Sequence, residues 1–265
     1  MASQILFFRK PYTDRTQPSV VANASESDDI ASYALNRGNI SAWVTTGSAD
    51  ANNTTWQVDW GDEKLVDSLL MILHNFKSFT VKYWDGSAYQ DFSPAISETT
   101  NTESTNYYSV TEVSTQRIQI TITGTQTPDV DKFLTQFIAT KQLGQFEGWP
   151  VIKNPTVLKN IKTTRMLSGK VNIAENAGGF SVQMDVPHWR NSQDLALIEQ
   201  IYRRTESFLV WLSGGDETQF FSVAEGYRNQ DIYLMKTVNE YTPEHVRGLY
   251  QAGRSVSIRL EEVVF

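Results

Sequence analysis

The sequence contains no cysteine. This absence excludes disulfides, thiolate nucleophiles and cysteine-ligated zinc sites together. A protein that must last outside a cell without disulfides usually relies on assembly with other chains.

Long apolar runs are missing as well. No run approaches the roughly 18 residues that span a bilayer. Near the start, apolar Ile5–Phe8 precedes Arg9 and Lys10, which reverses the order of a signal peptide. We therefore expect neither membrane insertion nor Sec export.

An excess of positive charge is also lacking. The chain has 23 basic and 30 acidic side chains and a net charge of −7. Residues 1–148 hold 17 acidic and 10 basic side chains, whereas residues 149–265 hold 13 of each. Since no basic stripe is available to grip phosphates, the sequence predicts no sequence-specific nucleic-acid partner.

Catalytic motifs are absent. The three histidines, His74, His188 and His245, lie far apart and have no metal-binding spacing. No Gly-x-Ser-x-Gly elbow, Walker A loop or dinucleotide fingerprint occurs. Carboxylates such as Asp59 and Asp62 lie close in sequence, but a solvated surface explains them better than a glycosidase pair. We predict that the protein is not an enzyme, and the sequence identifies no metal ligands and no cofactor.

The length of 265 residues favours two domains. Two glycines and a proline interrupt the pattern at Gly144–Pro150, where the charge balance also changes. We therefore predict domains at residues 1–148 and 149–265, both mostly β.

The first predicted domain shows alternation typical of strands. Ile118, Ile120 and Ile122 have a period of two, which places them on one buried face. Asp129–Ile138 fits either a short helix or a closing strand, and the pattern leaves both open. Further short strands are predicted at Gln57–Trp60, Ser68–Leu73, Phe79–Trp84 and Tyr107–Val110.

The order of Trp56–Gly61, Leu69–Asn75 and Thr80–Gly86 resembles the discoidin, or galactose-binding-like, jelly roll. The resemblance implies a sandwich that binds and displays rather than catalyses. Sugar sites in such sandwiches use exposed rings with polar neighbours near loops. The candidate ligand-binding residues are Trp43, Asn75, Trp84, Asp85 and Tyr89. The alternative for Trp43 is a ring in the core.

The second predicted domain contains a hairpin and a helix. Alternation over Thr163–Val186 surrounds the turn-like Glu175–Gly179. Asp194–Tyr202 is predicted to be a helix because Asp194 favours the first turn and an apolar stripe follows. The stripe consists of Leu195, Ile198, Ile201 and Tyr202.

This order of elements resembles the tail-tube-like module of long-tailed bacteriophages. The resemblance rests on the hairpin Arg165–Asp185, the helix, the strand Phe208–Trp211 and the terminal strand Val256–Val264. It implies a β-sandwich or split barrel with one flanking helix and a long hairpin, joined edge to edge into a ring. The sandwich precedes the ring module here, which departs from the usual order. The predicted interface residues are Arg165, Met166, Val171, Ile173, Phe180, Val182 and Met184.

Together the two resemblances predict a structural virion protein of a phage tail tip or baseplate, of the distal-tail or hub-like kind. It would form a homo-oligomeric ring, a hexamer or trimer, and its sandwich would contact other phage tail or baseplate proteins or a host glycan. It would be located in the virion after assembly in the host cytoplasm. The alternative is a monomeric carbohydrate-binding protein with two β-domains.

Overall fold

A computed structural model describes most of the chain between residues 5 and 263. The described residues are 5–12, 18–24, 30–36, 41–46, 50–147, 150–157, 160–165, 171–176, 179–189, 192–212, 232–241, 244–247 and 252–263. Strands dominate these residues, which contain a single α-helix, so the mostly-β prediction is confirmed.

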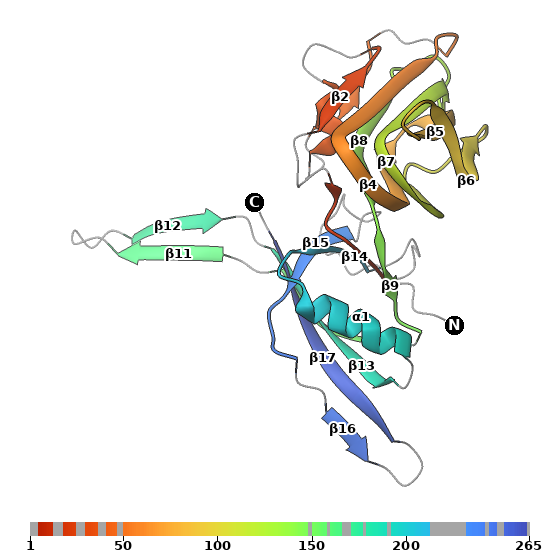
Figure 1. Cartoon of the computed structure of the whole chain (residues 1–265). Coiled ribbons are helices and arrows are strands. Elements are labelled where there is room, and N and C mark those ends of the chain that lie inside the picture. Colours follow the sequence, from red (N-terminus) through yellow and green to blue (C-terminus); the bar gives the residue numbers. More distant parts are fainter. Residues whose placement is uncertain are drawn as a thin grey trace. The chain divides into compact units, whose positions relative to one another are not determined.

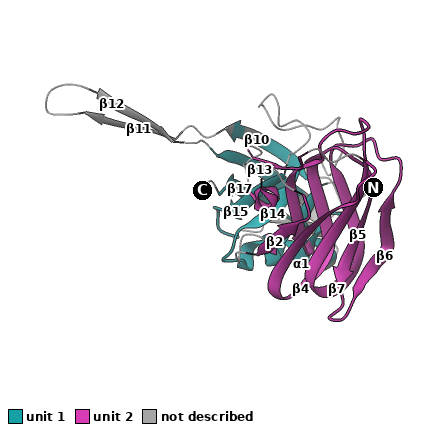
Figure 2. Cartoon of the chain, turned by 90° about the horizontal axis from the view of Figure 1, so that it is seen from above, with its two compact units in different colours: residues 1–10, 143–265 teal, residues 11–142 magenta. Residues whose placement is uncertain are grey.

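The chain forms two compact units (Figure 2). Residues 11–142 form one, here called the N-terminal sandwich, and residues 1–10 with 143–265 form the C-terminal unit. The prediction placed the boundary at residue 148 and put residues 1–10 in the first domain. The structure differs because β1 (Leu6–Phe8) pairs with β14 (Phe208–Trp211), a long-range pairing that no local pattern reveals.

The N-terminal sandwich contains a seven-stranded sheet in the order β3-β8-β4-β7-β5-β6, with β2 paired to β4. The pairings are antiparallel throughout its described strands. The strands are β2 (Ser19–Ala22), β3 (Trp43–Val44), β4 (Thr54–His74), β5 (Phe76–Trp84), β6 (Tyr89–Glu98), β7 (Asn106–Thr125) and β8 (Phe133–Thr140). The segment left open as helix or strand is therefore largely the strand β8.

Two long strands build both layers of the sandwich. β4 pairs with β7 first over Thr54–Asp59 and then, after an irregularity, over Lys64–Met71. The first stretch pairs with the part of β7 that also pairs with β5. The second stretch pairs with β8 as well. Gly61, with φ of +77°, lies in the bend between the stretches, where its backbone conformation suits glycine.

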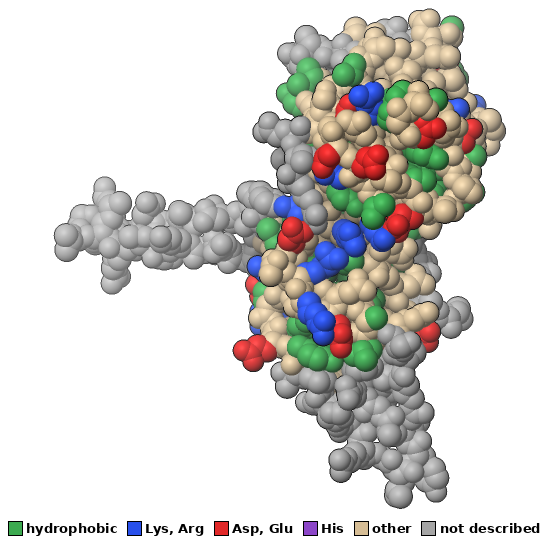
Figure 3. Space-filling view, viewed as in Figure 1, with side chains coloured by type: hydrophobic (Ala, Val, Ile, Leu, Met, Phe, Trp, Pro, Cys, Tyr) green, Lys and Arg blue, Asp and Glu red, His purple; other side chains and the backbone are tan. Residues whose placement is uncertain are grey.

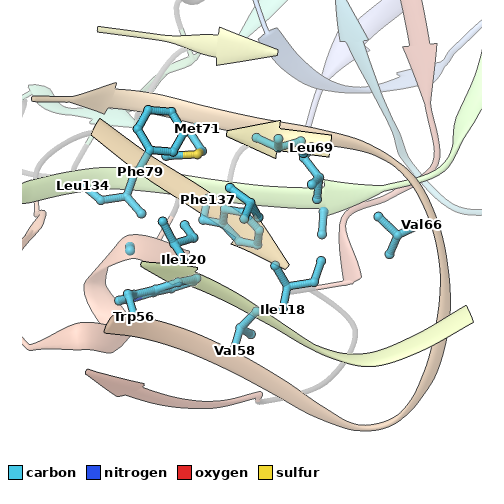
Figure 4. Close-up of a cluster of buried hydrophobic side chains, with 14 of the residues drawn as sticks. Trp56, Val58, Val66, Leu69, Met71, Phe79, Ile118, Ile120, Leu134 and Phe137 are labelled. Atoms are coloured by element: carbon cyan, nitrogen blue, oxygen red, sulfur yellow. The ribbon is translucent and has the colours of Figure 1, made fainter. Parts of the chain in front are cut away.

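The core of this unit lies between the two layers (Figure 4). Trp56, Ile118 and Ile120 come from one layer, and Phe137 comes from the other. The rings of Trp56 and Phe137 meet edge to face with centroids 5.1 Å apart. Ile118, Ile120 and Ile122 are all 0% exposed, so the predicted buried face is confirmed.

The C-terminal unit contains an eight-stranded sheet in the order β10-β13-β17-β15-β14-β1-β9, with β16 paired to β17 (Figure 1). Besides β1 and β14, its strands are β9 (Gln142–Gln145), β10 (Val151–Val157), β13 (Phe180–Trp189), β15 (Ile232–Thr237), β16 (Glu244–Arg247) and β17 (Ala252–Glu262). The predicted strands Phe208–Trp211 and Val256–Val264 correspond to β14 and β17.

The helix α1 (Ser192–Arg203) confirms the predicted helix. Ile198 and Ile201 are 0% exposed, and Leu195 and Tyr202 are partly buried against the same core. Asp194 accepts a hydrogen bond of 3.0 Å from the backbone N–H of Glu147. The apolar stripe therefore faces the core of the C-terminal unit.

The hairpin differs from the prediction. β11 (Asn160–Arg165) and β12 (Val171–Asn176) pair with each other in a separate two-stranded sheet. The following segment, β13, pairs with β10 and β17 instead. The turn-like Glu175–Gly179 therefore joins β12 to β13, a central strand of the large sheet. β13 pairs in that sheet because its apolar residues are buried there.

Candidate functional site

The β5–β6 hairpin ends in a tight turn that Asp85 organises. Its carboxylate accepts hydrogen bonds of 2.8 Å from the N–H groups of Ser87 and Ala88 and of 2.9 Å from the side chain of Gln90. The hydrogen bond from the backbone N–H of Ala88, followed by that from Ser87, holds the pKa of Asp85 far below its usual range. Gly86 has φ of +101°, which L side chains rarely adopt. Asp85 therefore holds the turn, and the structure does not support its predicted contact with a ligand.

The turn sets two aromatic rings side by side. Trp84 ends β5 and Tyr89 begins β6, directly opposite in the register. Their ring centroids are 5.2 Å apart and the rings meet edge to face at 65°. The Trp84 N–H donates to Thr115 Oγ1 at 3.2 Å, which fixes the end of β5 to β7. Both rings are half-buried, so each keeps part of its surface in solvent.

Arg117 of β7 lies beside this pair. Its guanidinium carbon is over the Trp84 ring, 5.4 Å from the centroid, in a cation–π contact. Its Nε donates to Asp59 Oδ2 at 2.5 Å, and Asp59 Oδ1 accepts the Gly61 N–H at 2.8 Å. Asp59 and Arg117 are also cross-strand partners on β4 and β7. The ion pair and the ring together fix the orientation of the guanidinium.

The hydroxyl of Tyr89 donates to Gln57 Oε1 of β4 at 2.5 Å. In the sheet order, β7 and β5 lie between β6 and β4. A flat sheet would separate the outer two strands by about 14 Å, because neighbouring strands lie about 4.8 Å apart. The sheet therefore curves toward this face. Burial raises the pKa of Tyr89, so its hydroxyl stays protonated as the donor.

These five side chains form one cluster on the outer face of the N-terminal sandwich, here called the Trp84 cluster. They alternate along their strands with core residues such as Val58 and Ile118, which are 0% exposed. The cluster offers ring surface next to polar groups, an arrangement suited to a ligand with apolar faces and hydrogen-bonding groups. Its members are Gln57, Asp59, Trp84, Tyr89 and Arg117.

Part of this cluster is predictable from the sequence. Trp84 and Tyr89 were predicted as ligand-binding residues, and the structure brings them together. Gln57 and Arg117 were missed, and Asp59 was noted only as a surface carboxylate. The signal available was strand alternation, since each lies next to a core residue, but only the β4–β7 register places them beside Trp84.

Two other predicted ligand residues serve the fold. Trp43 is 0% exposed and its Nε1 donates to the Ala24 carbonyl at 3.0 Å. Its predicted contact with a ligand is wrong, and the alternative of a core ring is correct. Asn75 donates through Nδ2 to the Asp131 carbonyl at 2.8 Å and accepts the Phe133 N–H at 3.0 Å. Its amide therefore ties the β4–β5 turn to the start of β8.

The predicted oligomer interface is wrong for three residues. Phe180, Val182 and Met184 are 5%, 0% and 0% exposed in the core of the C-terminal unit. β13 is a central strand with neighbours on both edges, and these three side chains pack in the core of their own unit. Arg165, Val171 and Ile173 lie on β11 and β12, whose side chains are outside the described residues, as is Met166 altogether.

Neither a metal cluster nor a membrane helix is found in the described part of the chain. No group of three or more His, Cys, Asp or Glu side chains there could hold a metal ion. No helix among the same residues is long and apolar enough to cross a membrane. On the face drawn in Figure 3, acidic and basic side chains of the N-terminal sandwich are interspersed with apolar ones.

Comparisons with known proteins give likenesses of fold only. No protein-family model and no curated protein matches the chain. A chitosan-binding module of a chitosanase/glucanase from Paenibacillus sp. IK-5 is 12% identical over 50% of this chain and 98% of the module, with a TM-score of 0.44. The family 32 carbohydrate-binding module of Clostridium perfringens NanJ, solved with galactose, is 16% identical over 52% of this chain and 99% of the module, with a TM-score of 0.42.

A third solved structure, SpGH29, is 17% identical over 51% of this chain, with a TM-score of 0.42. The alignment covers only 28% of that larger protein. The names of these three structures give no support to the predicted tail-tip role. A functional assignment therefore rests on the geometry of this chain itself.

Proposed function

We propose that this protein binds saccharides through the Trp84 cluster. The observation that carries the proposal is the half-exposed Trp84–Tyr89 pair, fixed edge to face beside Arg117. A pyranose ring presents C–H groups that pack on aromatic surface, and its oxygens accept or donate hydrogen bonds. Because the hairpin turn and the Asp59 ion pair already order these side chains, binding would cost little side-chain entropy.

Replacing Trp84 with alanine is expected to weaken saccharide binding at least tenfold, because exposed aromatic anchors contribute on the order of 2 kcal/mol when truncated. Binding of the full-length protein is measured on an oligosaccharide array, and positive ligands are then titrated by calorimetry. Tyr241→Ala is the matched control, since Tyr241 is a 38% exposed aromatic residue of the other unit. Equal affinity of the parent and the Trp84→Ala variant would exclude the cluster as the site.

The second candidate is a ring-forming component of a phage tail tip. One observation favours it: β11 and β12 pair only with each other among the described strands. A two-stranded ribbon is marginally stable alone, and its unpaired edges suit pairing with a neighbouring subunit. Residence in a virion belongs to this candidate.

Under this second candidate, the full-length protein should self-associate in solution. Replacing residues 161–175 with a short Gly-Ser turn should then convert the oligomer to a monomer, while the N-terminal sandwich stays folded. Light scattering after size exclusion measures the mass, and amide exchange at Ile118 and Ile120 reports on the sandwich. A parent protein that is monomeric at every concentration would rule out a homo-oligomeric ring formed by this chain alone.

A further inference from the structure

The hydrogen-bonding capacity left in the Trp84 cluster is mostly that of donors. Both oxygens of Asp59 already accept hydrogen bonds, from Arg117 Nε and the Gly61 N–H. Gln57 Oε1 accepts the Tyr89 hydroxyl. In contrast, Arg117 Nη1 and Nη2, Gln57 Nε2 and Trp84 Nε1 make no hydrogen bond to the residues that the structure describes.

Arg117 is the only charged donor among these groups, and contacts with Asp59 and Trp84 fix its position. Its Nε is bound to Asp59, and its guanidinium carbon lies over the Trp84 ring, 5.4 Å from the centroid. The side chain is 34% exposed, and its Nη atoms are not among the buried nitrogens that lack a hydrogen-bond partner. A guanidinium offers two parallel N–H donors in a plane, which match the two oxygens of a carboxylate. Because Nε is already bound to Asp59, the Nη edge of the guanidinium remains for a ligand.

The other charges on the same face are paired or engaged. Lys82 lies two residues before Trp84 on β5, and its Nζ is 3.2 Å from Oδ1 of Asp91 on β6. Asp85 is occupied by the hairpin turn. A neutral sugar usually needs acceptors for its hydroxyl protons as well as donors, and the oxygens of Asp59 and Gln57 each already accept one hydrogen bond within the cluster. A carboxylate supplies only acceptors and so fits the remaining donors.

We infer that the Trp84 cluster selects an acidic saccharide, whose carboxylate binds the Nη edge of Arg117 while its ring packs beside Trp84 and Tyr89. The inference rests on the proposed function and names the class of its ligand. The relevant chemistry is a hexuronate unit, in which a carboxylate is attached directly to the pyranose ring. Gln57 Nε2 and Trp84 Nε1 are left to donate to the ring oxygens and hydroxyl groups.

The test compares two probes with the same sugar backbone, one with charged carboxylates and one with neutral methyl esters. Trigalacturonic acid and its fully methyl-esterified form are titrated calorimetrically into the full-length protein. We expect the acid to bind at least about tenfold more tightly, the usual range for a charge-assisted bidentate pair. The affinity for the acid should fall as sodium chloride is raised, whereas the affinity for the ester should not.

Arg117→Lys keeps the positive charge but removes the planar fork, so it should lower the affinity for the acid about tenfold and bring it close to that for the ester. Lys153→Ala removes an exposed cation of the other unit and is the matched control. Thermal melting of each variant verifies that the fold is retained. Unchanged acid binding in Arg117→Lys would place the carboxylate elsewhere and overturn the assignment.

The same two probes, titrated into the parent protein and into Trp84→Ala, separate the inference from the proposed function. Equal affinities for the acid and the ester, both lost in Trp84→Ala, would overturn the preference for acidic saccharides and leave the proposed function standing. Absence of binding to any saccharide on the array would overturn both.

Discussion

Replacing Trp56 with alanine is expected to lower the free energy of unfolding of the N-terminal sandwich by about 3–5 kcal/mol. Trp56 is 0% exposed, and its ring contacts Phe137 of the opposite layer. Its Nε1 donates to the Ala31 carbonyl at 2.9 Å, which also holds the short 3-10 helix Ala31–Leu35 to the sheet. The substitution would remove the largest side chain joining the two layers at this point and leave a cavity.

Two further variants separate the causes of this loss. Trp56→Phe keeps most of the ring and removes the hydrogen bond to Ala31, so it should cost less than the alanine variant. Val21→Ala, at a position 60% exposed on β2, should change stability by less than about 0.5 kcal/mol. Urea unfolding is followed by amide exchange at Ile118 and Ile120, which report on this unit alone. A Trp56→Ala protein with the parent midpoint would show that the ring does not join the layers.

The sequence predicted the elements of the N-terminal sandwich better than its connections. The period-two pattern of Ile118, Ile120 and Ile122 identified a buried strand face, because alternation directly reports which side of a strand meets the core. The same pattern does not show that β4 and β7 each bend into two layers. That bend depends on a register shift after Asp59, which is a property of the paired strands.

The C-terminal hairpin shows how local turn chemistry can mislead. Glu175–Gly179 has the composition of a hairpin turn, yet the strands on its two sides do not pair with each other. Met184 of β13 pairs with Ile258 of β17 instead, within a sheet that buries both side chains. The apolar area buried by pairing with a distant strand stabilises the fold more than a favourable local turn does. The residues near the turn do not indicate which distant strand is the partner.

The candidate site also combines residues that the sequence groups together with residues that only the fold brings near. Trp84, Asp85 and Tyr89 are neighbours on one hairpin, so sequence analysis could group them. Arg117 and Gln57 come from other strands and reach the site only through the sheet register and its curvature. The sequence does not reveal that Asp85 holds its own turn, because an exposed carboxylate in a loop has the same local pattern whether it binds a ligand or the turn.

His74 should make the N-terminal sandwich sensitive to mild acid. Its side chain is 0% exposed, at the end of β4. Nε2 lies 2.7 Å from Asn106 Oδ1, and Nδ1 accepts the Phe76 N–H at 3.1 Å. The neutral tautomer with hydrogen on Nε2 satisfies both contacts. A second proton on Nδ1 would break the bond to Phe76 and place a charge between the rings of Phe76 and Phe79.

Burial lowers the pKa of His74 from 6.5 to about 4, although the hydrogen bond to Asn106 acts in the opposite direction. Between these two values the unfolded chain binds a proton that the folded chain does not. The contribution of His74 is therefore fully present above about pH 6.5 and is lost as the pH falls toward 4. The whole change amounts to about 3 kcal/mol, since each pKa unit corresponds to about 1.4 kcal/mol.

The measurement compares urea unfolding of the parent and of His74→Gln between about pH 7 and pH 4. Glutamine can donate to Asn106 and accept from Phe76, but it does not titrate. The other histidines, His188 and His245, and all carboxylates are present in both proteins, so their titrations cancel in the difference. We expect the parent to lose about 3 kcal/mol relative to the variant over this range. Parallel stability curves would mean that His74 has an ordinary pKa in the folded protein and that its burial does not control the acid response.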